Sequence, residues 1–112
     1  MATTYKVLGQ LAPAATTEST LYTVPAATSA VSSSIVICNQ AAAPATFRIA
    51  VVKSGGATVP AAALSWIVYG TTVAANDSTI LTMGLTLATG DKVQVYSSSA
   101  TLSFQIFGSE LA

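Results

Sequence analysis

The sequence contains no histidine, the side chain that most often serves as a general base near neutral pH and as a metal ligand. A Ser-His-Asp arrangement is therefore impossible, although serine is abundant. Four carboxylates remain, and a glycosidase pair would need two of them in one cleft. Asp77 and Asp91 lie in turn signals, where hydrogen bonds to nearby backbone amides are their common role. Glu18 lies in a polar loop and Glu110 near the C-terminus. We expect the chain not to be an enzyme.

Charge is scarce as well, because four basic and four acidic residues give a net charge of zero. A folded chain of this mass exposes roughly 5,700 Å². On average there is then one charge per about 700 Å² of surface, a charge density far below that of a typical soluble monomer. Neutral surface must therefore be extensive, and contiguous apolar patches above a few hundred Å² usually mark an interface. We therefore expect a homo-oligomer or a subunit packed in a larger assembly; the alternative is a monomer coated with Thr and Ser. The few dispersed basic residues provide no footprint for nucleic acid.

Other absences exclude further classes of protein. No run approaches the ~20 apolar residues of a membrane span, and residues 1–6 lack the apolar centre of a signal peptide. No glycine-rich loop precedes a helix, and the sequence 76–78 is typical of a turn and not of a calcium site. We expect no cofactor, metal, membrane contact or small-molecule substrate. The single cysteine, Cys38, lies in an apolar run and is expected in the core.

The clearest pattern in the chain is found in residues 32–53, where two apolar runs flank the break 39–45. In the second run, Phe47, Ile49 and Val51 alternate with smaller or more polar neighbours. This period of two is typical of half-buried strands. The break suits either a wide turn or a crossing between sheets. We expect these two strands at the centre of the fold.

Similar short runs recur along the rest of the chain at spacings of roughly 8–12 residues, with no convincing helix. This spacing predicts an all-β, single-domain antiparallel β-sandwich (jelly-roll-like) of about eight short strands that spans residues 1–112. The expected strands are 4–9, 20–24, 31–38, 45–53, 64–69, 78–83 continued by 85–88 after Gly84, 92–96 and 101–107.

Aromatic residues offer the main candidates for recognition. Alternation along strand 64–69 places Trp66 and Val68 on one face and Tyr69 on the other. Trp66 with Tyr69 is a possible platform for sugar, but core packing is the favoured interpretation for Trp66. Amphipathic or apolar aromatic residues near strand ends suit an interface, and the candidates are Tyr5, Tyr22, Tyr96 and Phe107.

Seven short segments form an ordered pattern along the chain, and they lie at 5–10, 21–26, 35–39, 75–78, 85–91, 95–97 and 107–110. This pattern resembles small virion structural proteins of tailed bacteriophages, including those that infect cyanobacteria. Together the segments cover nearly the whole chain, and no catalytic residue comes with them.

The resemblance implies a virion structural protein that is made in the host cytoplasm, with the major capsid protein or other virion proteins as partners. We expect most specifically a capsid decoration (cement) protein that stabilises the head by binding across capsid subunits. One alternative is a structural protein of the neck, tail or fibre. Another is a carbohydrate-binding module for host recognition.

Overall fold

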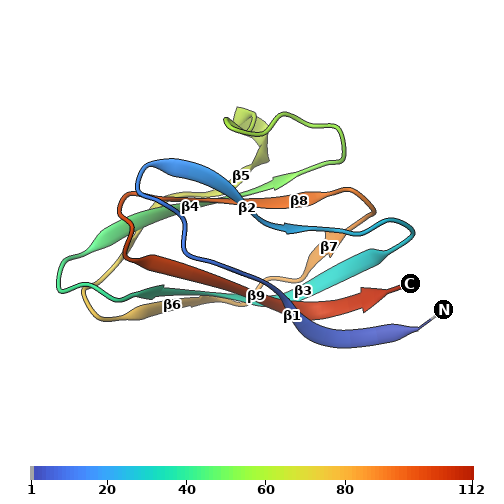
Figure 1. Cartoon of the computed structure of the whole chain (residues 1–112), viewed down its shortest axis with the longest axis horizontal. Coiled ribbons are helices and arrows are strands. Elements are labelled where there is room, and N and C mark those ends of the chain that lie inside the picture. Colours follow the sequence, from blue (N-terminus) through green and yellow to red (C-terminus); the bar gives the residue numbers. More distant parts are fainter. Residues whose placement is uncertain (1) are drawn as a thin grey trace.

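Alternating apolar residues fold the chain into two antiparallel sheets that pack face to face (Figure 1). The computed structural model describes residues 2–112. Within them, sheet A has the order β1-β9-β3-β6, with β7 also paired to β3, and sheet B has the order β2-β8-β4-β5. The strands are β1 (Thr3–Leu11), β2 (Thr17–Thr23), β3 (Ser29–Asn39), β4 (Ala45–Val52), β5 (Trp66–Val73), β6 (Ser78–Leu81), β7 (Leu85–Leu87), β8 (Lys92–Ser97) and β9 (Leu102–Leu111).

The connectivity is that of a jelly roll. Because β6 and β7 both pair with β3, they act as one strand interrupted near Gly84, and the sandwich then has eight strands in two four-stranded sheets. The predicted all-β sandwich is confirmed. The break 39–45 is a crossing between sheets, since β3 lies in sheet A and β4 in sheet B. Each of these two strands occupies an interior position of its own sheet.

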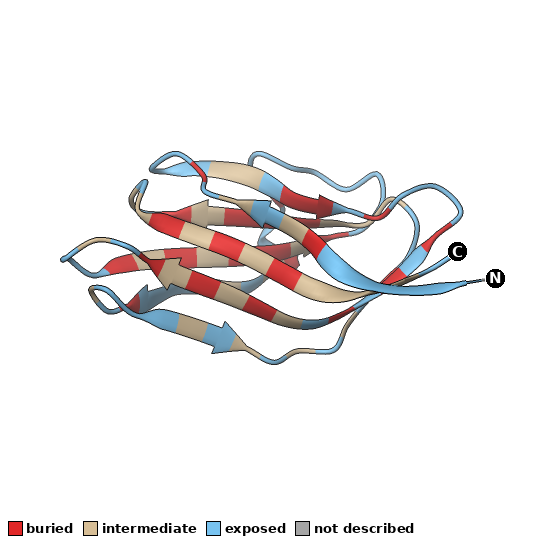
Figure 2. Ribbon diagram, turned by 60° about the horizontal axis from the view of Figure 1, so that its bottom comes forward, coloured by how far each residue is buried: buried red, intermediate tan, exposed pale blue. Residues whose placement is uncertain are grey.

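The core lies between the sheets and follows the alternation seen in the sequence (Figure 2). Ile35 and Ile37 of β3 face Phe47 and Ile49 of β4, and all four are fully buried. Phe47 packs edge to face on Phe104 of β9, with ring centroids 6.2 Å apart. The accessible surface of 5619 Å² agrees with the area expected from the chain's mass.

Cys38 does not belong to the core, contrary to expectation. Its neighbours Ile37 and Asn39 are buried, so alternation turns Cys38 to the outer face of sheet A, where it is partly exposed. There it lies opposite Ser103 and Ser78. The apolar run in the sequence concealed this, because the run continues on both faces of the strand.

Two features outside the sheets matter below. Residues 57–63 form a loop that ends in η1, a single turn of 3₁₀ helix (Ala63–Ser65), above the outer face of sheet B (Figure 1). The backbones of Ala2 and Ala112 exchange two hydrogen bonds of 2.7 and 3.0 Å, which holds the two ends of the chain side by side. No helix among residues 2–112 has the length and hydropathy to cross a bilayer.

Candidate functional site

The four predicted interface residues lie in three different environments. Tyr5 (84% exposed) and the half-buried Phe107 line one hollow on the outer face of sheet A, whereas Tyr96 lies on sheet B. Tyr22 is buried, so its selection as a contact residue is wrong. A β-bulge between Thr20 and Tyr22 turns both Tyr22 and its predecessor into the core.

The Tyr22 hydroxyl donates a hydrogen bond to Oε2 of Glu110, and Lys6 Nζ lies 3.0 Å from Oε1 of the same carboxylate. The hydrogen bond from Tyr22 and then that from Lys6 lower the pKa of Glu110. Burial, followed by the neighbouring carboxylate, raises the pKa of Tyr22. This cluster lies on the inner side of sheet A, because Tyr22 belongs to sheet B.

The outer face of sheet A carries little charge. Lys6 and Glu110 are the charged residues in its strands, and they pair with each other beside Tyr22, although the Lys6 side chain stays 44% exposed and also lines a hollow on this face. The outward positions hold Ser, Thr and Gln together with exposed apolar side chains. The exposed apolar residues there include Tyr5, Val7, Val31, Ile80 and Leu111. A hollow of about 370 Å³ lies among Tyr5, Val31 and Phe107.

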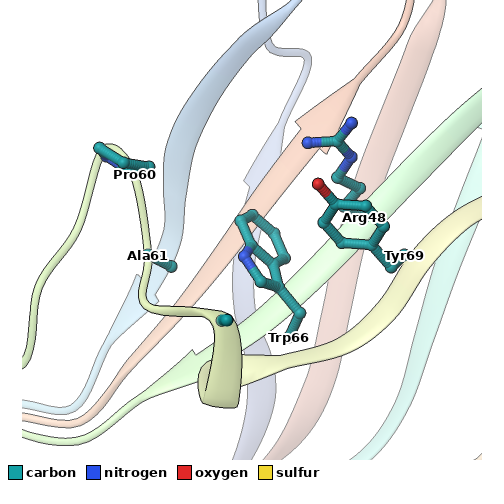
Figure 3. A pocket seen from close by; sticks show the side chains of 6 residues that line it. Arg48, Pro60, Ala61, Trp66 and Tyr69 are labelled. Atoms are coloured by element: carbon teal, nitrogen blue, oxygen red, sulfur yellow. The ribbon is translucent and has the colours of Figure 1, made fainter.

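Sheet B presents a different outer face, built around Arg48 of β4. Arg48 lies directly opposite Tyr69 of β5 on one side and Tyr96 of β8 on the other. Its guanidinium carbon is 4.1 Å from the Tyr69 ring centroid and 4.3 Å from that of Tyr96, so both rings make cation–π contacts with it. Trp66 stands edge to face with Tyr69, at a centroid distance of 5.7 Å (Figure 3).

A β-bulge at Ile67 brings Trp66 and Tyr69 to the same face. Trp66 pairs with Ala50, whereas Val68 pairs with Ile49, so Ile67 is the extra residue. Trp66 and Val68 therefore lie on opposite faces, and the prediction that they share one is wrong. Val68 packs on the main core, and Trp66 packs on a small separate cluster that includes Ala50 beneath the 57–63 loop. Trp66 thus packs on a core cluster, as expected, but on the small one outside sheet B and with part of its ring exposed.

Glu18 of β2 anchors that loop to the sheet. Its carboxylate accepts hydrogen bonds from the backbone N–H groups of Val59 (3.1 Å) and Ala61 (2.9 Å) and from Gln94 Nε2 (2.8 Å). Burial on its own would raise the pKa of Glu18, but these three donors outweigh it and the pKa is lowered. Local sequence gives no sign of this role, because the partners are about 40 to 76 residues away.

The loop and the sheet enclose an elongated groove. Its larger part, of about 490 Å³, is lined by Arg48, Pro60, Trp66 and Tyr69 together with small alanines. A smaller part, of about 280 Å³, shares Arg48, Pro60 and Trp66 and continues to Glu18 and Tyr96. Figure 3 shows the Trp66 ring between the loop and the Arg48–Tyr69 pair.

The remaining acidic residues hold turns together. Asp91 accepts hydrogen bonds from the backbone N–H groups of Ser54 and Ala88, both at 2.9 Å, and Asp77 accepts one from Ser78 at 2.8 Å. The turn roles predicted for Asp77 and Asp91 are confirmed. With Glu18 and Glu110, all four carboxylates accept hydrogen bonds within the fold.

Comparison with known proteins gives little to set beside this geometry. No family model matches the chain. No curated protein matches it either. Among solved structures, it is similar to a chain from the structure of infectious bursal disease virus, Gt strain, with a TM-score of 0.43 and 12% sequence identity. The match covers 97% of this chain and 30% of that one.

Proposed function

We propose that this protein is a virion structural component, and specifically a capsid decoration protein that binds across capsid subunits through the outer face of sheet A. The observation that carries the proposal is the scarcity of charge on that face, where Lys6 is already paired with Glu110, combined with the exposed side chains of Tyr5, Val7, Val31 and Ile80. Apolar area that water would otherwise cover contributes roughly 25 cal/mol per Å² when a partner buries it.

The physical logic fits a protein that works in many copies. A decoration protein stabilises a shell by mass action, because it binds the assembled state and not the separated subunits. A weak, flat contact is sufficient when symmetry repeats it around the particle. A net charge of zero limits repulsion between crowded copies. Jelly-roll sheets occur in viral capsid domains and also in lectins, so the topology is compatible with this role without selecting it.

The proposal includes no catalysis. The four carboxylates each serve a turn, a loop or an ion pair, and the sequence supplies no histidine to act beside them.

A matched pair of substitutions tests the docking face. Ile80→Lys places a charge on sheet A, and Ile67→Lys makes the same change on sheet B, where Ile67 is also exposed. Purified variants are mixed with particles assembled without this chain and then sedimented. We expect the wild type and Ile67→Lys to sediment with the particles and Ile80→Lys to remain in the supernatant.

Quantitative mass spectrometry of native particles then gives the position of the protein. A copy number that scales with the capsid subunits is expected for a decoration protein, whereas the copy number of a single ring would indicate the neck or tail. Wild-type protein that stays monomeric at high concentration and never sediments with particles would refute the proposal.

A further inference from the structure

We propose that the groove on the outer face of sheet B binds an acidic saccharide, that is, a sugar chain carrying carboxylate groups. The groove lies between the 57–63 loop and the residues Arg48, Trp66, Tyr69 and Tyr96. It is on the sheet opposite the proposed docking face, so this inference does not depend on the capsid proposal.

Arg48 selects for a carboxylate. Tyr69 and Tyr96 flank Arg48 on the two neighbouring strands, with its guanidinium carbon 4.1 and 4.3 Å from their ring centroids, so the two rings restrict how the guanidinium can lie. The single ion pair among residues 2–112 joins Lys6 to Glu110, so no acidic side chain of the described chain neutralises Arg48. A planar guanidinium held in one orientation presents parallel N–H groups that match a carboxylate in bidentate geometry.

The aromatic residues select for a sugar ring. An aromatic face carries negative charge density, which attracts the C–H groups on the flat side of a pyranose. Tyr69 is 64% exposed and Trp66 partly exposed, and they stand edge to face beside the larger part of the groove. The tyrosine hydroxyls and the indole N–H at the groove supply hydrogen-bonding groups suited to a ligand rich in hydroxyls. A volume of about 490 Å³ lies within the usual range of ligand sites.

The orientation of the groove favours a saccharide over an acidic peptide. The groove crosses the sheet from β5 over β4 and β8 toward β2, and the interior strands β4 and β8 are already paired on both sides. A peptide that lies in the groove would run across these strands, so its backbone could not pair with a free strand edge and extend the sheet. Recognition must come from side chains and ring faces, which suits a ligand without a peptide backbone.

The position of Glu18 sets the direction of the ligand. Glu18 lines only the smaller part of the groove, and its oxygens already accept three hydrogen bonds. A carboxylate of the ligand is therefore expected beside Arg48 in the larger part of the groove, away from Glu18.

Trp66 is the only tryptophan, so its fluorescence reports on this groove directly. The probes are a galacturonate tetramer, its neutral methyl ester, and a Glu-rich peptide of similar length. We expect saturable change in Trp66 emission with the galacturonate and at least about tenfold weaker binding of the ester. Arg48→Lys keeps the positive charge but loses the paired N–H donors of the guanidinium. It should therefore weaken galacturonate binding about tenfold or more and leave ester binding unchanged.

Tyr69→Ala and Tyr5→Ala form the matched controls, because both tyrosines are highly exposed but lie on opposite sheets. Tyr69→Ala should weaken binding of both sugars, and Tyr5→Ala should change neither; circular dichroism confirms that each variant is folded. Ile80→Lys, which tests the capsid proposal, should also leave sugar binding unchanged. The saccharide proposal is wrong if galacturonate causes no saturable change up to about 10 mM. It is equally wrong if Arg48→Lys binds galacturonate as the wild type does, or if only the peptide binds.

Discussion

Glu18 on β2 accepts a hydrogen bond of 2.9 Å from the backbone N–H of Ala61, and this contact ties the 57–63 loop to sheet B. Together with the bond from Val59, it holds the loop in place above the aromatic groove. We expect Glu18→Ala to lower the free energy of unfolding by about 1–3 kcal/mol, because Gln94 is fully buried and would lose its acceptor. Hydrogen exchange at the Val59 and Ala61 amides should accelerate, while the Ser65 amide, bonded to Ala62, serves as the internal control. Unchanged protection at both amides would contradict the anchoring role.

The hydrogen bond between Tyr22 and Glu110 gives a second prediction. Tyr22→Phe removes only the hydroxyl, so the ring still fills its place in the core. We expect a loss of about 1–2 kcal/mol and a rise in the pKa of Glu110 toward its ordinary value, measured by chemical denaturation and by NMR titration. Tyr96→Phe is the matched control, since no hydrogen bond of its hydroxyl is found among residues 2–112, and it should change stability by less than about 0.5 kcal/mol.

The same groups predict how stability depends on pH. Glu18 and Glu110 both have a pKa below the ordinary 4.5 in the folded chain, so their contribution is present above pH 4.5 and is lost as the pH falls through the folded values. The pKa of Tyr22 is raised above 10.0, so its contribution is present below pH 10 and is lost above it. We expect a plateau between these limits in denaturation midpoints measured across pH. In the double variant Glu18→Gln with Glu110→Gln, the fall on the acid side should shrink; an unchanged acid limb would show that other groups control it.

Close approach of the two sheets makes Gly9 hard to replace. A Cβ atom there would lie 2.3 Å from the backbone oxygen of Leu21 on β2, which is part of the opposite sheet and has little room to move. We expect Gly9→Ala to cost about 2–3 kcal/mol in thermal or chemical unfolding. Gly84 between β6 and β7 is the control, because a Cβ there meets nothing within 4 Å. Gly84→Ala should be nearly neutral, and equal losses at both sites would refute the steric argument.

Asn39 at the end of β3 is buried (1% exposed), and its side chain is fully used. Its amide nitrogen donates to Ala43 O (2.8 Å) and Val73 O (3.2 Å), and its oxygen accepts from the Thr101 hydroxyl. Asn39→Asp would place a carboxylate against these carbonyl oxygens and that of Ala74, so we expect a loss of about 3–5 kcal/mol at neutral pH.

This loss should be partly recovered in acid, where the new carboxyl is protonated and can donate one hydrogen bond. The control is Asn76→Asp at an exposed turn, which should have little effect at either pH. A pH-independent stability for Asn39→Asp would show that the site is open to water.

Alternation predicted the sandwich because the period of two depends only on which face of a strand is buried. It succeeded for Ile35, Phe47 and Phe104, where strands run without interruption. It failed at Tyr22 and at Trp66, because each follows or adjoins a bulge that inserts one residue and reverses the faces beyond it. Such bulges depend on the partner strand's register, which the local sequence does not encode.

From the sequence, only some of the residues that line the groove could be predicted, and not the groove itself. Trp66 with Tyr69 was considered as a sugar platform, but Arg48 was not part of that idea, because it meets Tyr69 and Tyr96 through pairing between β4, β5 and β8. These strands are distant in sequence and adjacent in space. The scarcity of charge was visible in the composition, whereas its scarcity on the outer face of sheet A became visible only when Lys6 and Glu110 were found to pair with each other.

The paired backbones of Ala2 and Ala112 have a consequence for engineering. A short peptide linker can join them without stretching either strand, and new ends can be opened at Gly55 and Gly56 in the turn after β4. The resulting circular permutant would retain every strand pair while moving the attachment points for fused cargo from sheet A to sheet B, at the same end of the sandwich.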